Sequence, residues 1–179
     1  MDLIERCQAG DKEAFAMLFQ QYKDMVYKIA YFMLGDAEEA EDALQEVFLR
    51  LYKALPNFDS QKAAFTTWVS RITMNYCLSQ RRKRNFSALS LEKASPLLID
   101  KNSSPQGQLE LEEEERAIHQ ALQRLDKKLR AVVIMRYYLE LPYAEIAQAL
   151  NIPVGTVKSR LNLALKALRR ELETRGVLR

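Results

Sequence analysis

The chain has 179 residues, of which 48% are hydrophobic and 28% charged, so it can bury the core of one domain or of two small ones. The formal net charge of +3 excludes a strongly acidic or strongly basic chain. The charges are nevertheless segregated, because seven Lys or Arg and only two Glu occur from Ile152 onward, whereas six carboxylates and no cation lie within 36–46.

Several classes of protein are disfavoured. No apolar stretch is long enough to cross a membrane, and the polar N-terminus does not resemble a signal peptide. Cys7 and Cys77 match no metal-binding or redox spacing, and the single His119 argues against a catalytic triad or a zinc site. We therefore expect a cytoplasmic protein with reduced thiols, no catalytic residues, no cofactor, no metal and no membrane insertion.

The first third of the chain has helical periodicity. Apolar residues recur every three or four positions over 15–33, with Asp11 as the expected N-cap and Gly35 as the expected stop. Asp36 should cap a second helix that ends near Pro56.

A third helix should begin at Thr66 or Thr67 and continue through the basic segment 81–84. Residues 1–88 therefore predict one all-helical domain. Residues 89–108 contain serines, two prolines and a glycine without periodicity, which is typical of a flexible linker.

The remaining residues, 109–179, predict a second helical domain. Helices should resume near 109 and again after Asp126, a natural N-cap, and two shorter helices should follow near 143–150 and 154–174. No strand pattern is present in the sequence, so the predicted fold class is all-α, with two small domains joined by the linker.

The segment from Tyr143 to Asn162 has the anatomy of a helix-turn-helix. Ala147 is small where two helices must cross, and Asn151 tolerates the left-handed backbone of the turn. Pro153 suits the start of a second helix, whose free amides and exposed side chains could read the major groove of duplex DNA. The candidate reading residues are Thr156, Lys158, Ser159 and Arg160.

The third helix carries amide, hydroxyl and cationic groups suited to unpaired bases and phosphates. The candidates are Arg71, Asn75, Ser79, Arg81, Arg82, Lys83 and Arg84. Trp68 could stack on a base, but its position on the apolar stripe favours a core residue. The basic segment 81–84 could likewise be only a solvated helix end.

The stretches DAEEAEDALQEVFLRLYKALPNFD and FTTWVSRITMNYCLSQRRKR, together with the helix-turn-helix, resemble an extracytoplasmic-function (ECF) sigma factor. This class of bacterial sigma factor has only a region-2 and a region-4 domain. The resemblance implies binding to core RNA polymerase through the β′ clamp and the β flap, binding to promoter DNA, and regulation by an anti-sigma factor. It implies that the segment matching Asp36–Tyr52 docks on the β′ clamp through Asp36, Glu39, Asp42, Gln45, Glu46 and Phe48. A dense carboxylate face beside an apolar ridge suits a basic partner surface, although it could also be an ordinary solvated helix face.

By the same resemblance, the third helix and the loop before it would capture a flipped base of the −10 element, with Asn75 at the base-contacting position and Ser79 one turn on. The helix-turn-helix would bind the −35 element. The chain departs from the family at 162–165, which read Asn-Leu-Ala-Leu where many members continue with a basic or aromatic run.

The predicted function is therefore promoter recognition and DNA melting with core RNA polymerase. The alternative is a free-standing helix-turn-helix regulator that never joins the polymerase. An enzyme of nucleic-acid metabolism is a more distant possibility, because it would need a metal-binding cluster of carboxylates.

Overall fold

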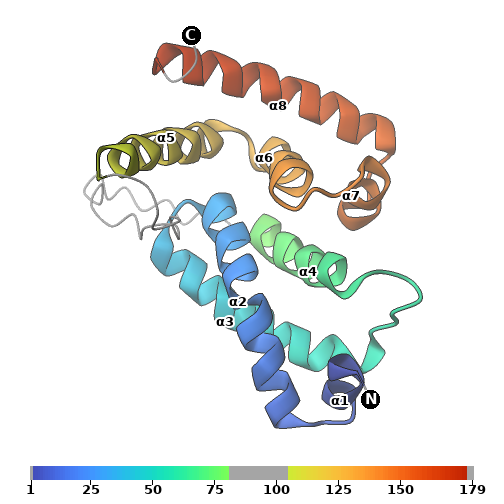
Figure 1. The fold of residues 1–179 in the computed structure, drawn as a ribbon. Helices are drawn as coiled ribbons and strands as arrows, with labels where there is room; N and C mark the ends of the chain where they lie inside the picture. The colour runs from blue at the N-terminus through green and yellow to red at the C-terminus, as the bar shows by residue number, and fades with distance from the viewer. Residues whose placement is uncertain (1, 81–104, 177–179) are drawn as a thin grey trace.

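The structure is a computed structural model that describes residues 2–80 and 105–176, with side chains described for 2–80 and 115–176. The first range forms one helical body (Figure 1). Its elements are α1 (Leu3–Gln8), α2 (Lys12–Leu34), α3 (Ala37–Ala54), the short 3₁₀ turn η1 (Leu55–Asn57) and α4 (Phe65–Ser79).

The second range forms another helical body, which lies above the first in Figure 1. Its elements are α5 (Pro105–Arg124), α6 (Lys127–Val133), the π-helical turn η2 (Ile134–Tyr138), α7 (Tyr143–Leu150) and α8 (Val154–Thr174). The described ranges contain no strand. The all-α, two-domain prediction is therefore confirmed.

The predicted helix ends are confirmed where local chemistry determines them. The Asp11 carboxylate accepts hydrogen bonds from the amides of Glu13 and Ala14 at the start of α2, which satisfies donors that a helix leaves free. Asp36 accepts the amide of Glu39 in the same way. Gly35 ends α2 with φ +84°, a left-handed conformation that glycine adopts without steric cost.

Other helix boundaries differ from the prediction. Helix α1 was not predicted, yet Asp2 caps it through a capping box with Glu5. Helix α5 begins at Pro105, inside the predicted linker, because proline suits the first turn of a helix. Helix α4 begins at Phe65 and ends at Ser79, so the predicted helical run through 81–84 lies outside the described residues, as does the predicted linker up to position 104.

Two clusters of buried apolar residues hold the fold together. One lies wholly within the first body and joins α1 to α4, with Leu18, Val47 and Leu51 at its centre. The other is shared, because buried residues of α2 to α4 and of α5 to α8 belong to one continuous cluster. The two bodies therefore bury apolar surface against each other, and this burial contributes to holding them together.

Candidate nucleic-acid and polymerase interfaces

The helix-turn-helix is present as predicted. Helices α7 and α8 are joined by a turn in which Asn151 has φ 52° and ψ 52°, in the left-handed region. Ile146 on α7 packs with Val157 and Leu161 on α8, and all three side chains are buried. Buried apolar contacts therefore set the angle between the two helices, and the opposite face of α8 is exposed to solvent.

The predicted −35 residues lie at the start of α8. Lys158 and Ser159 are exposed, while Thr156 and Arg160 are half-buried. The Ser159 hydroxyl donates to the Thr156 carbonyl at 3.0 Å, which leaves its oxygen free to accept. The first two turns of α8 therefore present a cation and a hydroxyl near the free amides of the helix N-terminus, a combination that suits a phosphate or a base edge.

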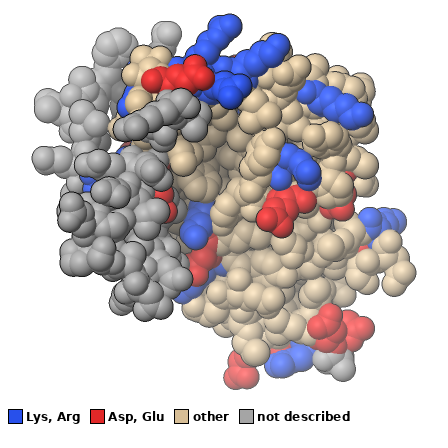
Figure 2. Space-filling model, turned by 45° about the horizontal axis from the view of Figure 1, so that its top comes forward, with Lys and Arg blue, Asp and Glu red and all other residues tan. Residues whose placement is uncertain are grey.

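The rest of α8 carries an exposed basic face. Lys166, Arg169 and Arg170 are all exposed, and Figure 2 shows Lys and Arg side chains gathered at the top of the molecule, where α8 lies. Where the sequence departs from the family, Leu163 is 59% exposed and Ala164 is buried. The Leu163 side chain therefore faces solvent.

Helix α4 holds the predicted −10 residues that the structure describes. Asn75 and Ser79 are exposed on one side of the helix, and Arg71 is half-buried beside them. Met74 and Cys77 fill the opposite, buried side. The Asn75 amide is thus open to solvent. Arg81, Arg82, Lys83 and Arg84 lie outside the described residues.

Trp68 packs at the edge of the core. Its ring lies 4.9 Å from that of Phe58 and 5.5 Å from that of Phe65, measured between centroids, and the side chain is half-buried. The core alternative for Trp68 is therefore supported.

Helix α3 presents the predicted polymerase face. Asp42 and Gln45 are exposed. Glu46 is half-buried and pairs with Arg50 at 2.9 Å. Asp36 is exposed but its carboxylate caps α3, and Glu39 is half-buried in the first turn.

Phe48 requires a correction. Its side chain is only 5% exposed, and its ring packs 4.6 Å from Phe19 on α2. The predicted direct contact with a partner is not retained, because Phe48 points from α3 into the core against α2. The helical period that places Asp42, Gln45 and Glu46 outward places Phe48 inward.

Leu49 and Tyr52 are exposed apolar residues that the sequence analysis missed. They are 57% and 47% exposed on α3, and Tyr52 contacts Phe15 edge-on with a centroid distance of 5.0 Å. The signal was available in the sequence, since Leu49 and Tyr52 stand four and seven positions after Gln45 and so share its helix face. An apolar patch beside carboxylates is typical of a protein-binding surface.

Within 2–80 and 115–176, no group of three His, Cys, Asp or Glu side chains is placed to hold a metal ion. Both cysteines are free and buried, and burial raises the pKa of Cys77 to about 12 against the opposing charge of Lys127. None of the helices that the structure describes is sufficiently long and apolar to span a membrane.

Comparison with known proteins matches a family model to each of the two bodies. The Sigma-70 region 2 family matches residues 18–86, and the Sigma-70, region 4 family matches residues 115–168. Among solved structures, the fold is similar to CnrH in its complex with the cytosolic domain of CnrY, with a TM-score of 0.68 and 21% identity over 96% of each chain. It is also similar to the sigma factor RpoE in complex with the anti-sigma factor NepR from Bartonella quintana, with a TM-score of 0.66 and 20% identity over 89% of this chain and 96% of that one.

Curated relatives are more similar in sequence and match over nearly the full length. The chain is 36% identical to the ECF RNA polymerase sigma factor SigW of Bacillus subtilis over 94% of both chains. It is 34% identical to the RNA polymerase sigma-H factor of Pseudomonas aeruginosa, over 96% of this chain and 92% of the relative. It is 32% identical to the ECF RNA polymerase sigma-E factor of Escherichia coli K12, over 93% and 90%. With a region-2 body, a region-4 helix-turn-helix and relatives of this similarity, the chain belongs to the ECF sigma factors of the sigma-70 family.

Proposed function

We propose that this sigma factor divides promoter recognition among three exposed helix faces. Helix α3 binds core RNA polymerase, α4 captures an unpaired base of the −10 element, and α8 reads the −35 element. The observation that carries this proposal is that Asn75 on α4 and Lys158 on α8 are both exposed, while buried apolar residues fix the opposite face of each helix.

The polymerase face consists of Asp36, Glu39, Asp42, Gln45, Glu46, Leu49 and Tyr52. Its carboxylates steer a basic partner surface into place, and the exposed Leu49 and Tyr52 supply the apolar contact that holds it. Phe48 supports this face from below by packing α3 on α2.

The −10 face consists of Arg71, Asn75 and Ser79, followed in the chain by Arg81, Arg82, Lys83 and Arg84. Flipping a base out of the duplex costs a few kcal/mol. Stacking, at about 1–3 kcal/mol per base, and hydrogen bonds from the Asn75 amide would offset that cost. The arginines and the lysine would neutralise the phosphates of the captured strand.

The −35 face consists of Thr156, Lys158, Ser159 and Arg160. These residues lie in the first two turns of α8, where a recognition helix contacts base edges in the major groove. Since Leu163 and Leu165 are exposed further along α8, readout concentrates at its N-terminal end.

Transcription in vitro tests the proposal. The purified chain is added to bacterial core RNA polymerase and a library of promoter fragments, and the transcripts are sequenced. We expect a stable complex with core polymerase and transcripts from promoters that share one −35 and one −10 sequence. Sequence-specific binding to duplex DNA without any complex with core polymerase would instead support the free-standing regulator.

The proposal assigns no chemistry to this chain itself, because polymerase performs the nucleotidyl transfer. It places the protein in the cytoplasm, where the polymerase acts. It also includes an anti-sigma factor as a partner, on the basis of family membership.

A further inference from the structure

The two bodies are joined by a buried arginine. Arg130, at the end of the first turn of α6, is 2% exposed. Within its own body its guanidinium donates to the carbonyls of Leu122, Gln123 and Leu125, at 2.7, 2.7 and 3.0 Å. It also donates to the carbonyl of Met33, in the last turn of α2 in the other body.

Gln123 reinforces the same contact. Its side-chain oxygen accepts from Arg130 at 2.7 Å, and its side-chain nitrogen donates to the carbonyl of Phe32 at 2.9 Å. A Cβ atom added to Gly35 would lie 2.4 Å from the Gln123 side-chain oxygen. The C-terminal end of α2 is therefore fitted closely against the α5–α6 corner.

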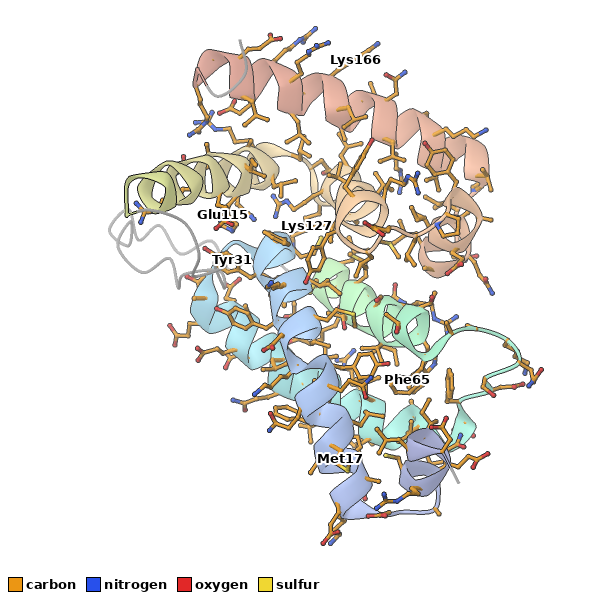
Figure 3. The ribbon with its side chains drawn as sticks, viewed as in Figure 1. Met17, Tyr31, Phe65, Glu115, Lys127 and Lys166 are labelled. Carbon is orange, nitrogen blue, oxygen red and sulfur yellow. The ribbon has the colours of Figure 1, made fainter. Side chains whose placement is uncertain are left out.

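Lys127 makes the equivalent contact at α4. Its ammonium group donates to the carbonyl of Gln80, which follows the last residue of α4. Figure 3 shows Lys127 at the junction of the two bodies, whereas Met17 lies near the far end of α2. Cations are stabilising at helix C-termini, and neither α2 nor α4 has a basic residue in its own last turn. The region-4 body therefore supplies the capping cations for two helices of the region-2 body.

A fourth contact lies on the helix that we assign to the −10 element. The Thr67 hydroxyl on α4 donates to the Glu145 carboxylate on α7 at 3.0 Å. A carboxylate held against α4 would repel the phosphates of a DNA strand bound along that helix. The rings of His119 and Tyr31 also stack across the interface, 4.3 Å apart between centroids.

This closed arrangement is too short to contact both promoter elements. By their names the −35 and −10 elements lie about 25 base pairs apart, which is about 85 Å of duplex at about 34 Å per turn of about 10 base pairs. A compact chain of this length has a radius of gyration of about 16 Å and so measures about 40 Å across. The bodies must separate before one molecule can contact both elements.

We propose that Gln123, Lys127 and Arg130 form a latch between the two bodies, which holds the free sigma factor closed and prevents it from spanning a promoter. The inhibitory part of this inference rests on the proposed function, and the latch itself does not. Only molecules in which the two bodies have separated can bind both elements. Any change that raises the fraction of such open molecules therefore lowers the apparent Kd for a two-element promoter in proportion.

The test compares the full chain with a double variant, Gln123→Ala with Lys127→Met, and with Lys127→Met alone. Neither residue belongs to the three faces assigned above. Lys128→Met is the matched control, because it removes the same charge from an exposed neighbour on the same helix. Small-angle X-ray scattering measures the radius of gyration of each protein without DNA.

Binding is then measured with two DNA probes. One is a promoter fragment selected by transcription with core polymerase, with a pre-melted −10 element; the other is a duplex that carries only the −35 element. We expect the wild type and Lys128→Met to be compact and the latch variants to be expanded by several Å. The double variant should bind the two-element probe about tenfold more tightly, equivalent to about 1.4 kcal/mol, with unchanged affinity for the −35 duplex.

An expanded wild type, or latch variants as compact as the wild type, would overturn the latch. Expanded variants without tighter binding to the two-element probe would overturn its inhibitory role. If none of the proteins binds either probe or supports transcription, the proposed function is wrong. The scattering measurement would still show whether the latch holds the two bodies together. Circular dichroism checks that each variant is folded. If the double variant loses helicity, the comparison between Lys127→Met and the wild type tests the latch instead.

Discussion

The guanidinium of Arg130 on α6 donates a hydrogen bond to the backbone carbonyl of Met33 at the end of α2, 97 residues earlier in the chain. One side chain of the region-4 body thus completes the hydrogen bonding of a helix in the region-2 body. The same guanidinium also binds three carbonyls around the α5–α6 corner. Arg130 therefore organises its own domain and the contact between the domains.

Replacing Arg130 with Met should lower the free energy of unfolding by about 3 kcal/mol or more. The change leaves several buried carbonyls without donors, each at a cost of about 1–3 kcal/mol before relaxation. Urea unfolding followed by circular dichroism measures the effect. The control is Arg124→Met, which removes an exposed pair with Glu171 and should cost at most about 1 kcal/mol. Equal midpoints for the two variants would show that the Arg130 network is not structural.

Phe48 and Leu49 should separate packing from partner binding, because they are neighbours that point in opposite directions. Phe48→Ala should lower the free energy of unfolding by about 3 kcal/mol, since it opens a cavity between α3 and α2. Leu49→Ala should leave stability within about 0.5 kcal/mol and weaken binding to core polymerase. Urea unfolding and a polymerase-binding titration check both variants. Unchanged polymerase affinity in Leu49→Ala would remove Leu49 from the interface.

Asp36 combines a helix cap with a predicted partner contact, and two substitutions distinguish these roles. Asp36→Ala should lower the free energy of unfolding by about 1 kcal/mol, because Glu39 loses its capping acceptor. Asp36→Ser should retain stability, since serine also caps, while it removes the charge. If the charge contributes to polymerase binding, both variants lose affinity. Wild-type affinity in Asp36→Ser would assign Asp36 to capping alone.

Asn75→Ala should slow open-complex formation and leave polymerase binding intact. The side chain is exposed, so stability should change by less than about 0.5 kcal/mol. Permanganate footprinting of the −10 region measures melting, and a native gel measures assembly with the polymerase. Parallel loss of melting and assembly would mean that Asn75 supports the fold of α4 instead of contacting a base.

Cys77 should make the protein less stable at alkaline pH. Burial raises the pKa of its thiol from 9.0 to about 12, so between these values the unfolded thiol ionises while the folded one keeps its proton. Ionisation then favours the unfolded state by up to about 1.4 kcal/mol per pH unit. Urea midpoints of the wild type and Cys77→Ala, measured from pH 8 to about pH 10.5, should show a shallower decline for the variant. Identical declines would show either that the Cys77 thiol keeps its proton in the unfolded protein as well, or that burial does not raise its pKa in the folded protein.

Much of the local structure was predictable because it depends on residues close in sequence. Asp11, Asp36 and Asp126 cap helices through amides two or three positions away. Asn151 adopts the left-handed turn for a reason intrinsic to its short polar side chain. Helical periodicity likewise identified the packed side of α8, on which Val157 and Leu161 lie.

The helices, most of their ends and the residues that share each helix face follow from local sequence. Which helix each face meets depends on packing between segments far apart in the chain, so it is visible only in the assembled fold. Phe48 lies on the apolar stripe of α3 and was assigned to a partner contact only by resemblance, but only the fold shows that its ring packs against Phe19 on α2. Arg130 is the opposite case: a charged residue in a polar stretch is buried, because only the assembled fold brings the carbonyl of Met33 within its reach.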